Sequence, residues 1–437
     1  MVDLTSLTVA MNGIEVGTLS QDRSGAMTFR YRPEWLKRPG ARAISLSLPL
    51  TMAAYRGKAV YNFFDNLLPD SEAIRGRLQA RFQVPTRHPF DLLASIGRDC
   101  VGAIQLYPHD MTMPDVRRVV AEPLDERAIE ALLVGYQDTP LGMGRNQDFR
   151  ISLAGAQEKT ALLWHQGTWQ RPAGSTPTSH IFKLPIGFLE HSNIDLRHSG
   201  ENEWLCLQLL KAFGVPVAEA ELARFGAQQV LVVERFDRRW AEDGSWLMRL
   251  PQEDFCQALG VAPALKYESD GGPGIHAALR LLRGSQQARL DQDLFFKAQL
   301  LFWLLAAIDG HAKNFSLFLE PDSAYRMTPL YDVISAYPLM RQGSMAPERA
   351  KMAMAVKGKN RHYRWARMEP RHFVHTADQA GFSIERVTAM IQEIAERADT
   401  IVADVDGRLP ADFPAATSEP VFEGILQQTA RLKAFLA

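Results

Sequence analysis

The strongest constraint in this sequence is a carboxylate and a carboxamide five positions apart, Asp309 and Asn314, directly after the apolar segment 294–308. This is the spacing of a protein-kinase catalytic loop, in which the Asp orients or deprotonates the attacking hydroxyl and the Asn holds Mg2+ against the nucleotide phosphates. Such a loop requires a second metal-binding Asp farther along the chain. Asp332 follows after two short β-like stretches. This order predicts a phosphotransferase with Asp309 as the catalytic residue and Asn314 and Asp332 as Mg2+ ligands.

The chain is long enough for more than one domain, and its two halves differ in pattern. At 437 residues it exceeds one ordinary domain. Short apolar runs and turn signals fill the first hundred residues, with a hairpin signal at Asn12-Gly13, whereas helical patterns dominate from residue 252 onward. The expected fold class is α+β, bilobal and protein-kinase-like, with a β-rich N-terminal half and a mostly helical C-terminal half. The expected divisions are a β-rich subdomain (1–108), a connecting segment (109–145), the nucleotide-binding part of the N lobe with a hinge near 234–237 (146–240), and a helical C lobe with the catalytic loop 309–314 (241–437).

The composition indicates a globular protein, with 46% hydrophobic and 23% charged residues. The N-terminus lacks a basic region followed by an apolar stretch, and the longest strongly apolar stretch, 298–308, is too short to span a bilayer. The three cysteines are odd in number, widely separated and set in apolar surroundings, which is typical of buried thiols in a reducing compartment. We expect a cytoplasmic protein without a membrane segment.

Three further segments, in kinase order, suit the binding of a nucleotide. The small residues Ala154–Ala156 would let backbone N–H groups approach phosphate oxygens, although on their own they are more typical of a plain turn. Lys183 lies inside a short apolar strand, where it needs either an anionic partner such as a phosphate or a path to solvent. The apolar strand 230–233 runs into Glu234-Arg235-Phe236, a candidate hinge whose backbone would bond an adenine edge.

Several long stretches of the sequence closely resemble the HipA family, the serine/threonine kinase toxins of bacterial toxin–antitoxin pairs. They are Tyr61–Asp70, Asp148–Ser152, Ala154–Lys159, Val233–Trp240, Pro251–Asp254, Lys266–Gly274 and Asp309–Ser316. The resemblance covers nearly the whole chain. It implies Mg2+ and ATP as cofactors and Ser152 as an autophosphorylation site whose modification expels the phosphate-binding loop. It also implies an ATP site lined by Ala154, Gly155, Ala156, Gln157, Glu158, Lys159, Lys183, Glu234, Arg235, Phe236, His311, Ala312, Lys313, Asn314, Tyr331 and Asp332.

The resemblance further implies a substrate, a partner and a role in the cell. The implied substrate is glutamyl-tRNA synthetase, whose phosphorylation would block translation and cause growth arrest or persistence. The implied partner is a HipB-like helix-turn-helix antitoxin, which would inactivate the kinase and repress the operon with it on operator DNA. The segment from Arg341 to Arg371 contains nine basic residues and only two acidic residues, so it can attract DNA phosphates. The resemblance implies that Lys357, Lys359 and Arg361 in this segment contact DNA. The alternative for that segment is a basic surface that is solvated or faces an acidic partner.

The sequence also fits two other functions. The protein could act mainly as a DNA-associated corepressor with weak kinase activity. It could also be a small-molecule phosphotransferase of the aminoglycoside type, which shares the spacing from Asp309 to Asn314 and a later Asp but leaves the first hundred residues unexplained. A Ser-His-Asp hydrolase is disfavoured because the sequence has no G-x-S-x-G motif.

Overall fold

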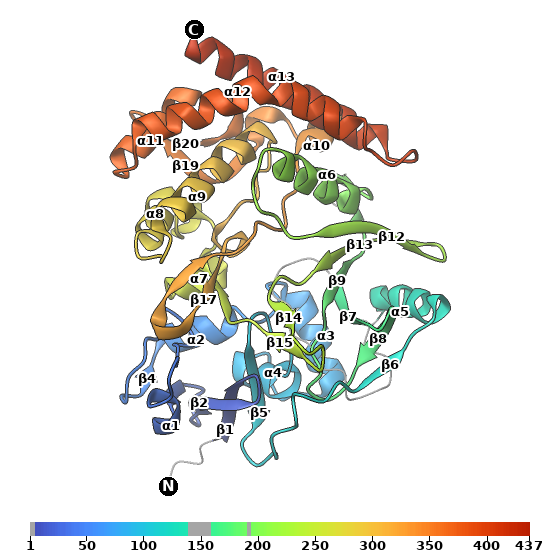
Figure 1. The fold of residues 1–437 in the computed structure, drawn as a ribbon, viewed down its shortest axis with the longest axis vertical. Helices are drawn as coiled ribbons and strands as arrows, with labels where there is room; N and C mark the ends of the chain where they lie inside the picture. Colours follow the sequence, from blue (N-terminus) through green and yellow to red (C-terminus); the bar gives the residue numbers. More distant parts are fainter. Residues whose placement is uncertain (1–4, 139–158, 190–193) are drawn as a thin grey trace. The chain divides into compact units, whose positions relative to one another are not determined.

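The computed structural model describes residues 5–138, 159–189 and 194–437, which form two compact units (Figure 1). The first unit comprises Met1–Leu184, Ala223–Ala264 and Ser316–Tyr325, and the second comprises Pro185–Leu222, Leu265–Phe315 and Arg326–Ala437. The units are therefore interleaved in the sequence, because the chain returns to the first unit twice. The prediction of a mixed α and β fold, with strands concentrated early and helices late, is confirmed.

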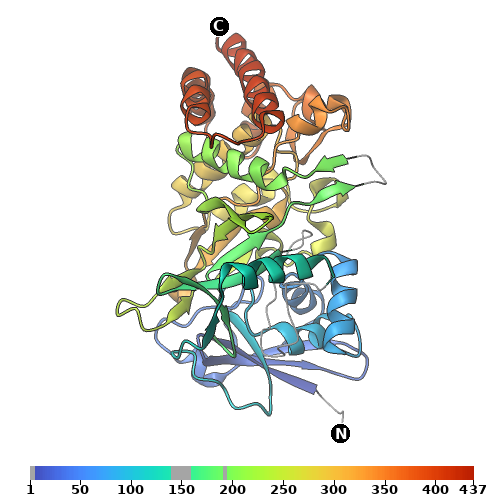
Figure 2. The ribbon, with the colours of Figure 1, turned by 90° about the vertical axis from the view of Figure 1, so that its right-hand side faces the viewer.

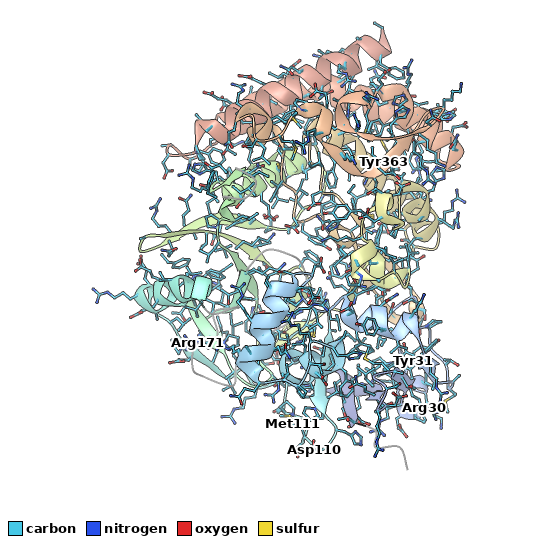
Figure 3. All side chains as sticks on the ribbon, turned by 180° about the vertical axis from the view of Figure 1, so that it is seen from behind. Arg30, Tyr31, Asp110, Met111, Arg171 and Tyr363 are labelled. Carbon is cyan, nitrogen blue, oxygen red and sulfur yellow. The ribbon has the colours of Figure 1, made fainter. Side chains whose placement is uncertain are left out.

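The first sheet of the first unit has five strands in the order β4-β3-β2-β1-β5. β1 and β2 form the hairpin predicted at Asn12-Gly13, whose φ angles of 47° and 75° are the positive values that this two-residue turn requires. Tyr31 on β3 (Figure 3) is buried, and its hydroxyl donates a hydrogen bond to the carbonyl oxygen of Leu48 at 2.5 Å. Helices α2 and α4 pack against the sheet over one apolar core. The bounds are β1 (Thr5–Met11), β2 (Ile14–Gln21), β3 (Met27–Tyr31), α1 (Pro33–Leu36), β4 (Tyr55–Arg56), α2 (Lys58–Asp65), α3 (Glu72–Phe82), α4 (Pro89–Ile96) and β5 (Ile104–Pro108).

The second sheet of this unit has six strands in the order β12-β13-β9-β7-β8-β6. The segment 109–145, expected to be a connection, contributes both β6 and α5, because β6 pairs with β8 and α5 buries Ile129 and Leu133 in the core under the sheet. The bounds are β6 (Ala121–Pro123), α5 (Glu126–Asp138), β7 (Lys159–His165), β8 (Thr168–Pro172), β9 (His180–Lys183), β12 (Ala220–Phe225) and β13 (Gln228–Glu234). Shorter elements complete the unit: β14 (Arg238–Trp240), β15 (Leu247–Arg249), β16 (Gln252–Asp254), α7 (Phe255–Ala258), β17 (Ser316–Leu319) and β18 (Tyr325–Met327).

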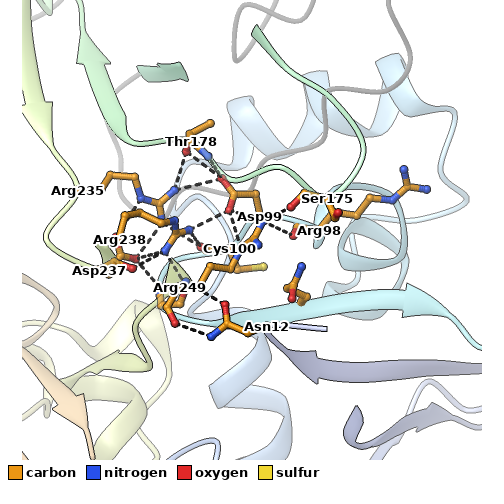
Figure 4. Close-up of polar contacts among 12 residues, drawn as sticks. Asn12, Arg98, Asp99, Cys100, Ser175, Thr178, Arg235, Asp237, Arg238 and Arg249 are labelled. Atoms are coloured by element: carbon orange, nitrogen blue, oxygen red, sulfur yellow. Dashed lines mark hydrogen bonds and ion pairs between the residues drawn. The ribbon is translucent and has the colours of Figure 1, made fainter. Parts of the chain in front are cut away.

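A buried ionic network, the Asp99 network, joins distant segments of the first unit (Figure 4). Both carboxylate oxygens of Asp99 are bound by guanidinium groups, at 2.9 Å by Arg238, 3.1 Å by Arg249 and 3.3 Å by Arg235. Asp237 binds Arg235 at 2.9 Å and Arg238 at 3.0 Å. Burial by itself would raise the pKa of Asp99, but the three guanidinium groups outweigh burial and hold that pKa well below its usual value. The network thus fixes the end of α4 to β14 and β15.

Glu253 on β16 is a fully buried carboxyl group whose Oε1 accepts a hydrogen bond from the backbone N–H of Leu46 at 2.8 Å. Burial raises the pKa of Glu253 from its ordinary value of 4.5 to about 8. The folded chain therefore keeps a proton that the unfolded chain loses, so the contribution of Glu253 to stability is complete below about pH 4.5 and is lost as the pH rises to about 8. We expect Glu253→Gln, which resembles the protonated acid, to reduce the loss of stability between pH 5 and pH 8. The reduction should exceed about 1.4 kcal/mol, the free energy of differential protonation over one pH unit.

Urea unfolding at pH 5, 6.5 and 8 measures this effect. Glu242→Gln is the matched control, because Glu242 is exposed in the same unit. A Glu253→Gln protein whose stability changed with pH as steeply as that of the wild type would contradict the prediction.

The second unit is mostly helical, and α9 lies at its centre. α9 is buried almost all round from Phe295 to Leu304, as the apolar segment 294–308 predicts. The helix nevertheless ends at Leu304 rather than Ile308, because Ala306 has a φ of 48° and the N–H of Ala307 donates to the carbonyl of Phe302. α12 and α13 pack side by side (Figures 1 and 2). The bounds are β10 (Gly187–Leu189), β11 (Ile194–Leu196), α6 (Ser199–Ala212), α8 (Ile275–Leu282), α9 (Ala288–Leu304), α10 (Tyr337–Arg341), β19 (Lys351–Lys357), β20 (Arg361–Arg364), α11 (Pro370–Gln379), α12 (Ile384–Asp406) and α13 (Ala415–Leu436).

No helix among the described residues is long and apolar enough to cross a bilayer.

Candidate active site

The loop that carries Asp309 begins where α9 ends. Asp309 is exposed, and its backbone carbonyl accepts the N–H of His311 at 2.8 Å. Gly310 lies against the ring of Phe302, where a Cβ atom would come within 2.5 Å of the ring. Only glycine therefore fits at this position without moving the helix. From Ala312 to Asn314 the loop forms one turn of 3-10 helix, and it is buried there.

Asn314 joins the two aspartates that the sequence singles out. Its side-chain Nδ2 donates to the carbonyl oxygen of Asp309 at 3.1 Å and to the carbonyl oxygen of Asp332 at 3.2 Å. These two acceptors identify the nitrogen of the carboxamide, so its Oδ1 is the atom that would be offered to a metal ion. The backbone of Asp332 has a φ of 59°, a left-handed conformation that is uncommon outside glycine. One buried carboxamide thus holds two carboxylate residues together although they are far apart in sequence.

The chemistry of these groups suits Mg2+. The carboxylate of Asp332 and the amide oxygen of Asn314 are hard oxygen donors, which Mg2+ prefers over nitrogen and sulfur. Within the described part of the chain, no group of three or more His, Cys, Asp and Glu side chains could hold a metal ion by itself. Mg2+ commonly takes one or two protein carboxylates and completes its coordination with nucleotide phosphates and water.

Two tyrosines hold neighbouring segments against the loop. The hydroxyl of Tyr331 donates to the carbonyl of Lys313 at 2.8 Å, which fixes the residue before Asp332. The hydroxyl of Tyr267 donates to the Oδ1 atom of Asp309 at 2.6 Å. No sequence signal connects Tyr267 with Asp309, because Tyr267 precedes Asp309 by more than forty residues and no spacing rule joins the two. The second unit therefore brings together Asp309, His311, Ala312, Lys313, Asn314, Tyr331 and Asp332.

In the first unit, two lysines expected at the nucleotide lie opposite each other. β7 and β9 are antiparallel, and their register pairs Lys159 with Lys183. Lys183 is only 7% exposed. Directly opposed residues of antiparallel strands have neighbouring side chains, and like charges at such positions repel each other. The register therefore places the two lysines expected at the nucleotide next to each other in the sheet.

The three residues of the expected hinge, Glu234, Arg235 and Phe236, differ in their exposure and in their contacts. Glu234 is exposed at the end of β13, and the ring of Phe236 meets Phe318 edge to face at 5.8 Å. Arg235 is 3% exposed, its guanidinium belongs to the Asp99 network, and its N–H donates to the carbonyl of Ser179. The side chain of Arg235 is thus occupied in holding the fold together.

Other expected site residues lie elsewhere. Ser152, Ala154, Gly155, Ala156, Gln157 and Glu158 lie outside the described residues. Lys357, Lys359 and Arg361 lie on the hairpin of β19 and β20, where Lys359 and Arg361 are exposed. We call residues 351–364 the basic hairpin.

The apolar helix, the loop from Asp309 to Asn314 and the later Asp332 follow one another as in protein-kinase-like phosphotransferases. Comparison with known proteins gives the family. Residues 7–107 match the HipA N-terminal domain and residues 151–402 match the HipA-like C-terminal domain. The chain belongs to the HipA family of toxin-type kinases.

Individual relatives agree with this assignment. The chain is 33% identical over 411 residues to Y4mE of Sinorhizobium fredii, covering 91% of this chain and 92% of the relative. It is 28% identical over 345 residues to the serine/threonine-protein kinase toxin HipA of Shewanella oneidensis, covering 76% and 75%. The fold is similar to a chain in the structure of HipA, HipB and operator DNA from Shewanella oneidensis MR-1, with a TM-score of 0.80, 23% identity, and coverage of 98% of this chain and 97% of that one.

Proposed function

We propose that this protein is a Mg2+- and ATP-dependent serine/threonine kinase that transfers the γ-phosphate of ATP to a protein hydroxyl. The observation that carries the proposal is the carboxamide of Asn314, which holds the backbone of Asp309 and of Asp332 in one cluster. A Ser-His-Asp triad would catalyse hydrolysis. The exposed carboxylate of Asp309, beside the oxygen donors of Asn314 and Asp332, instead suits phosphoryl transfer with Mg2+. Membership of the HipA family supports the same activity.

Each group would have a distinct role in the reaction. The carboxylate of Asp309 accepts a hydrogen bond from the acceptor hydroxyl and directs its oxygen at the γ-phosphorus. Asn314 and Asp332 would hold Mg2+, which when bound neutralises charge on the phosphates. Lys159 and Lys183, which the first unit pairs across two strands, would add positive charge for nucleotide phosphates. Because phosphoryl transfer needs little covalent work from a protein, this positioning supplies most of the catalysis.

The proposal extends to regulation and partners as the family resemblance implies them. Ser152 would be the autophosphorylation site, and glutamyl-tRNA synthetase the substrate whose modification arrests growth. A HipB-like antitoxin would bind the kinase and repress the operon with it on operator DNA. The structural match to HipA in a complex with HipB and operator DNA supports the antitoxin and DNA. The exposed cations of the basic hairpin, Lys359 and Arg361, support a phosphate contact.

The test is a transfer assay with purified protein, γ-labelled ATP and Mg2+. We expect label on glutamyl-tRNA synthetase and, on the kinase itself, at Ser152, with both signals abolished by EDTA. Label on an aminoglycoside but on no protein would replace the proposal with a small-molecule phosphotransferase. Operator binding with the neighbouring antitoxin but no transfer to any acceptor would replace it with the corepressor function.

A further inference from the structure

Tyr267 contacts the catalytic loop at two of its residues, and the residue before it contacts a third. Its hydroxyl donates to Oδ1 of Asp309 at 2.6 Å, within the range of hydrogen bonds to a charged oxygen. Its ring meets the ring of His311 edge to face, with centroids 5.0 Å apart. The carbonyl of the preceding residue, Lys266, accepts the N–H of Ala312 at 3.2 Å. The hydroxyl therefore approaches Asp309 from a segment that is itself attached to the loop.

The backbone around Tyr267 is held by a tight glycine-rich turn. The carbonyl of Tyr267 accepts the N–H groups of Asp270 and of Gly272, the latter at 2.9 Å. A Cβ atom on Gly272 would come within 1.8 Å of the carbonyl oxygen of Leu265, so no other residue fits there. The turn accordingly sets the direction in which the Tyr267 side chain leaves the backbone.

The next residue, Glu268, attaches the same segment to the basic hairpin. Its Oε2 accepts the N–H of Ala355 on β19 at 2.7 Å, and its Oε1 lies 3.8 Å from the guanidinium of Arg361. A Cβ atom on Gly274 would collide with the carboxylate of Glu268, at 2.2 Å. Tyr267 is therefore fixed from both sides, by the catalytic loop and by β19, before any substrate binds.

The carboxylate of Asp309 needs such a partner because the residue is exposed. An exposed Asp rotates about its side-chain bonds, and only some orientations present an oxygen to the acceptor hydroxyl. A donor on Oδ1 removes most of that freedom and leaves Oδ2 for the acceptor. Misplacement of a reacting group by about 1 Å can cost about 10²-fold in rate, so the orientation of this carboxylate bears directly on turnover.

We propose that Tyr267 is a positioning residue for Asp309, whose hydroxyl holds the catalytic carboxylate in the orientation that receives the acceptor hydroxyl. This inference rests on the proposed kinase function. The segment 266–274, one of the stretches that resemble the HipA family, would thus position the catalytic carboxylate in addition to stabilising the fold.

The test is Tyr267→Phe, which removes the hydroxyl and keeps the ring against His311. We expect kcat for transfer to protein to fall about 10- to 100-fold, while KM for ATP and the melting temperature stay close to those of the wild type. Tyr61→Phe is the matched control, because Tyr61 is exposed on α2 in the first unit, and it should leave kcat unchanged. The split between kcat and KM matters, because a merely structural role would lower the melting temperature or raise KM as well.

The possible outcomes separate the two proposals. If the wild type transfers phosphate and Asp309→Asn does not, while Tyr267→Phe keeps the wild-type kcat, the inference about Tyr267 is wrong and the kinase function stands. A Tyr267→Phe protein that loses activity together with melting temperature or ATP affinity would also overturn the positioning role. A wild-type protein that transfers no phosphate to any acceptor overturns the kinase function and this inference with it.

Discussion

Asp309→Asn is expected to lower the rate of phosphoryl transfer by about 10²–10⁴-fold, the usual contribution of a positioned acid or base. The substitution removes the negative charge that accepts the hydrogen bond of the acceptor hydroxyl. It keeps the backbone carbonyl to which Asn314 donates, and its own side-chain oxygen can still accept from Tyr267. The loop should therefore fold normally, and the loss should appear in kcat with KM for ATP little changed.

Initial rates of label transfer measure this effect, and growth of cells that express each protein gives an independent readout. Asp378→Asn is a suitable control, because Asp378 is an exposed Asp on α11 in the same unit and should behave as the wild type. An Asp309→Asn protein that still arrested growth would show that toxicity does not depend on phosphoryl transfer.

The second large effect is expected in the Asp99 network. Asp99→Asn should destabilise the first unit by about 3–5 kcal/mol, because removing one partner of a buried ion pair leaves an uncompensated buried charge. Arg235 and Arg238 would then keep only the carboxylate of Asp237, and Arg249 would lose its ion pair with Asp99, in a site from which water is largely excluded. The destabilisation should be complete above the ordinary Asp pKa of 3.8, and therefore at neutral pH, and should shrink as the pH falls toward the depressed pKa of Asp99.

Chemical denaturation at pH 7 measures the destabilisation. Asp399→Asn provides the contrast, since Asp399 pairs with Lys433 at 2.5 Å on the surface and both side chains are at least half exposed. Such a surface pair contributes at most about 1 kcal/mol. If both substitutions cost the same, the Asp99 network would not be the structural junction that its burial indicates.

The Asp99 network also joins, within the first unit, segments that belong to two different matched regions of the family. Asp99 belongs to the part that matches the HipA N-terminal domain, and its three arginines belong to the part that matches the HipA-like C-terminal domain. The sequence pattern does not predict these buried ion pairs, because isolated charged residues in otherwise ordinary segments look like surface residues. Arg235 illustrates the difference, since its position suggested a nucleotide contact and its guanidinium is buried against Asp99 and Asp237.

Sequence by itself determined the local features of this protein. The hairpin at Asn12-Gly13, the buried helix before the catalytic loop, and the strands β17 and β18 all follow from turn chemistry and from apolar periodicity over a few residues. The order and spacing of Asp309, Asn314 and Asp332 likewise needed no structure to be noticed.

Only the tertiary structure decided what these residues touch. It places the carboxamide of Asn314 on the carbonyl of Asp332, brings the hydroxyl of Tyr267 to Asp309, and pairs Lys159 with Lys183 across two strands. It also returns residues 223–264 and 316–325 to the first unit, which a division of the chain into consecutive domains does not anticipate. The physical reason is that hydrogen-bonded turns and periodicity act between neighbours in sequence, whereas these contacts depend on which distant segments pack together.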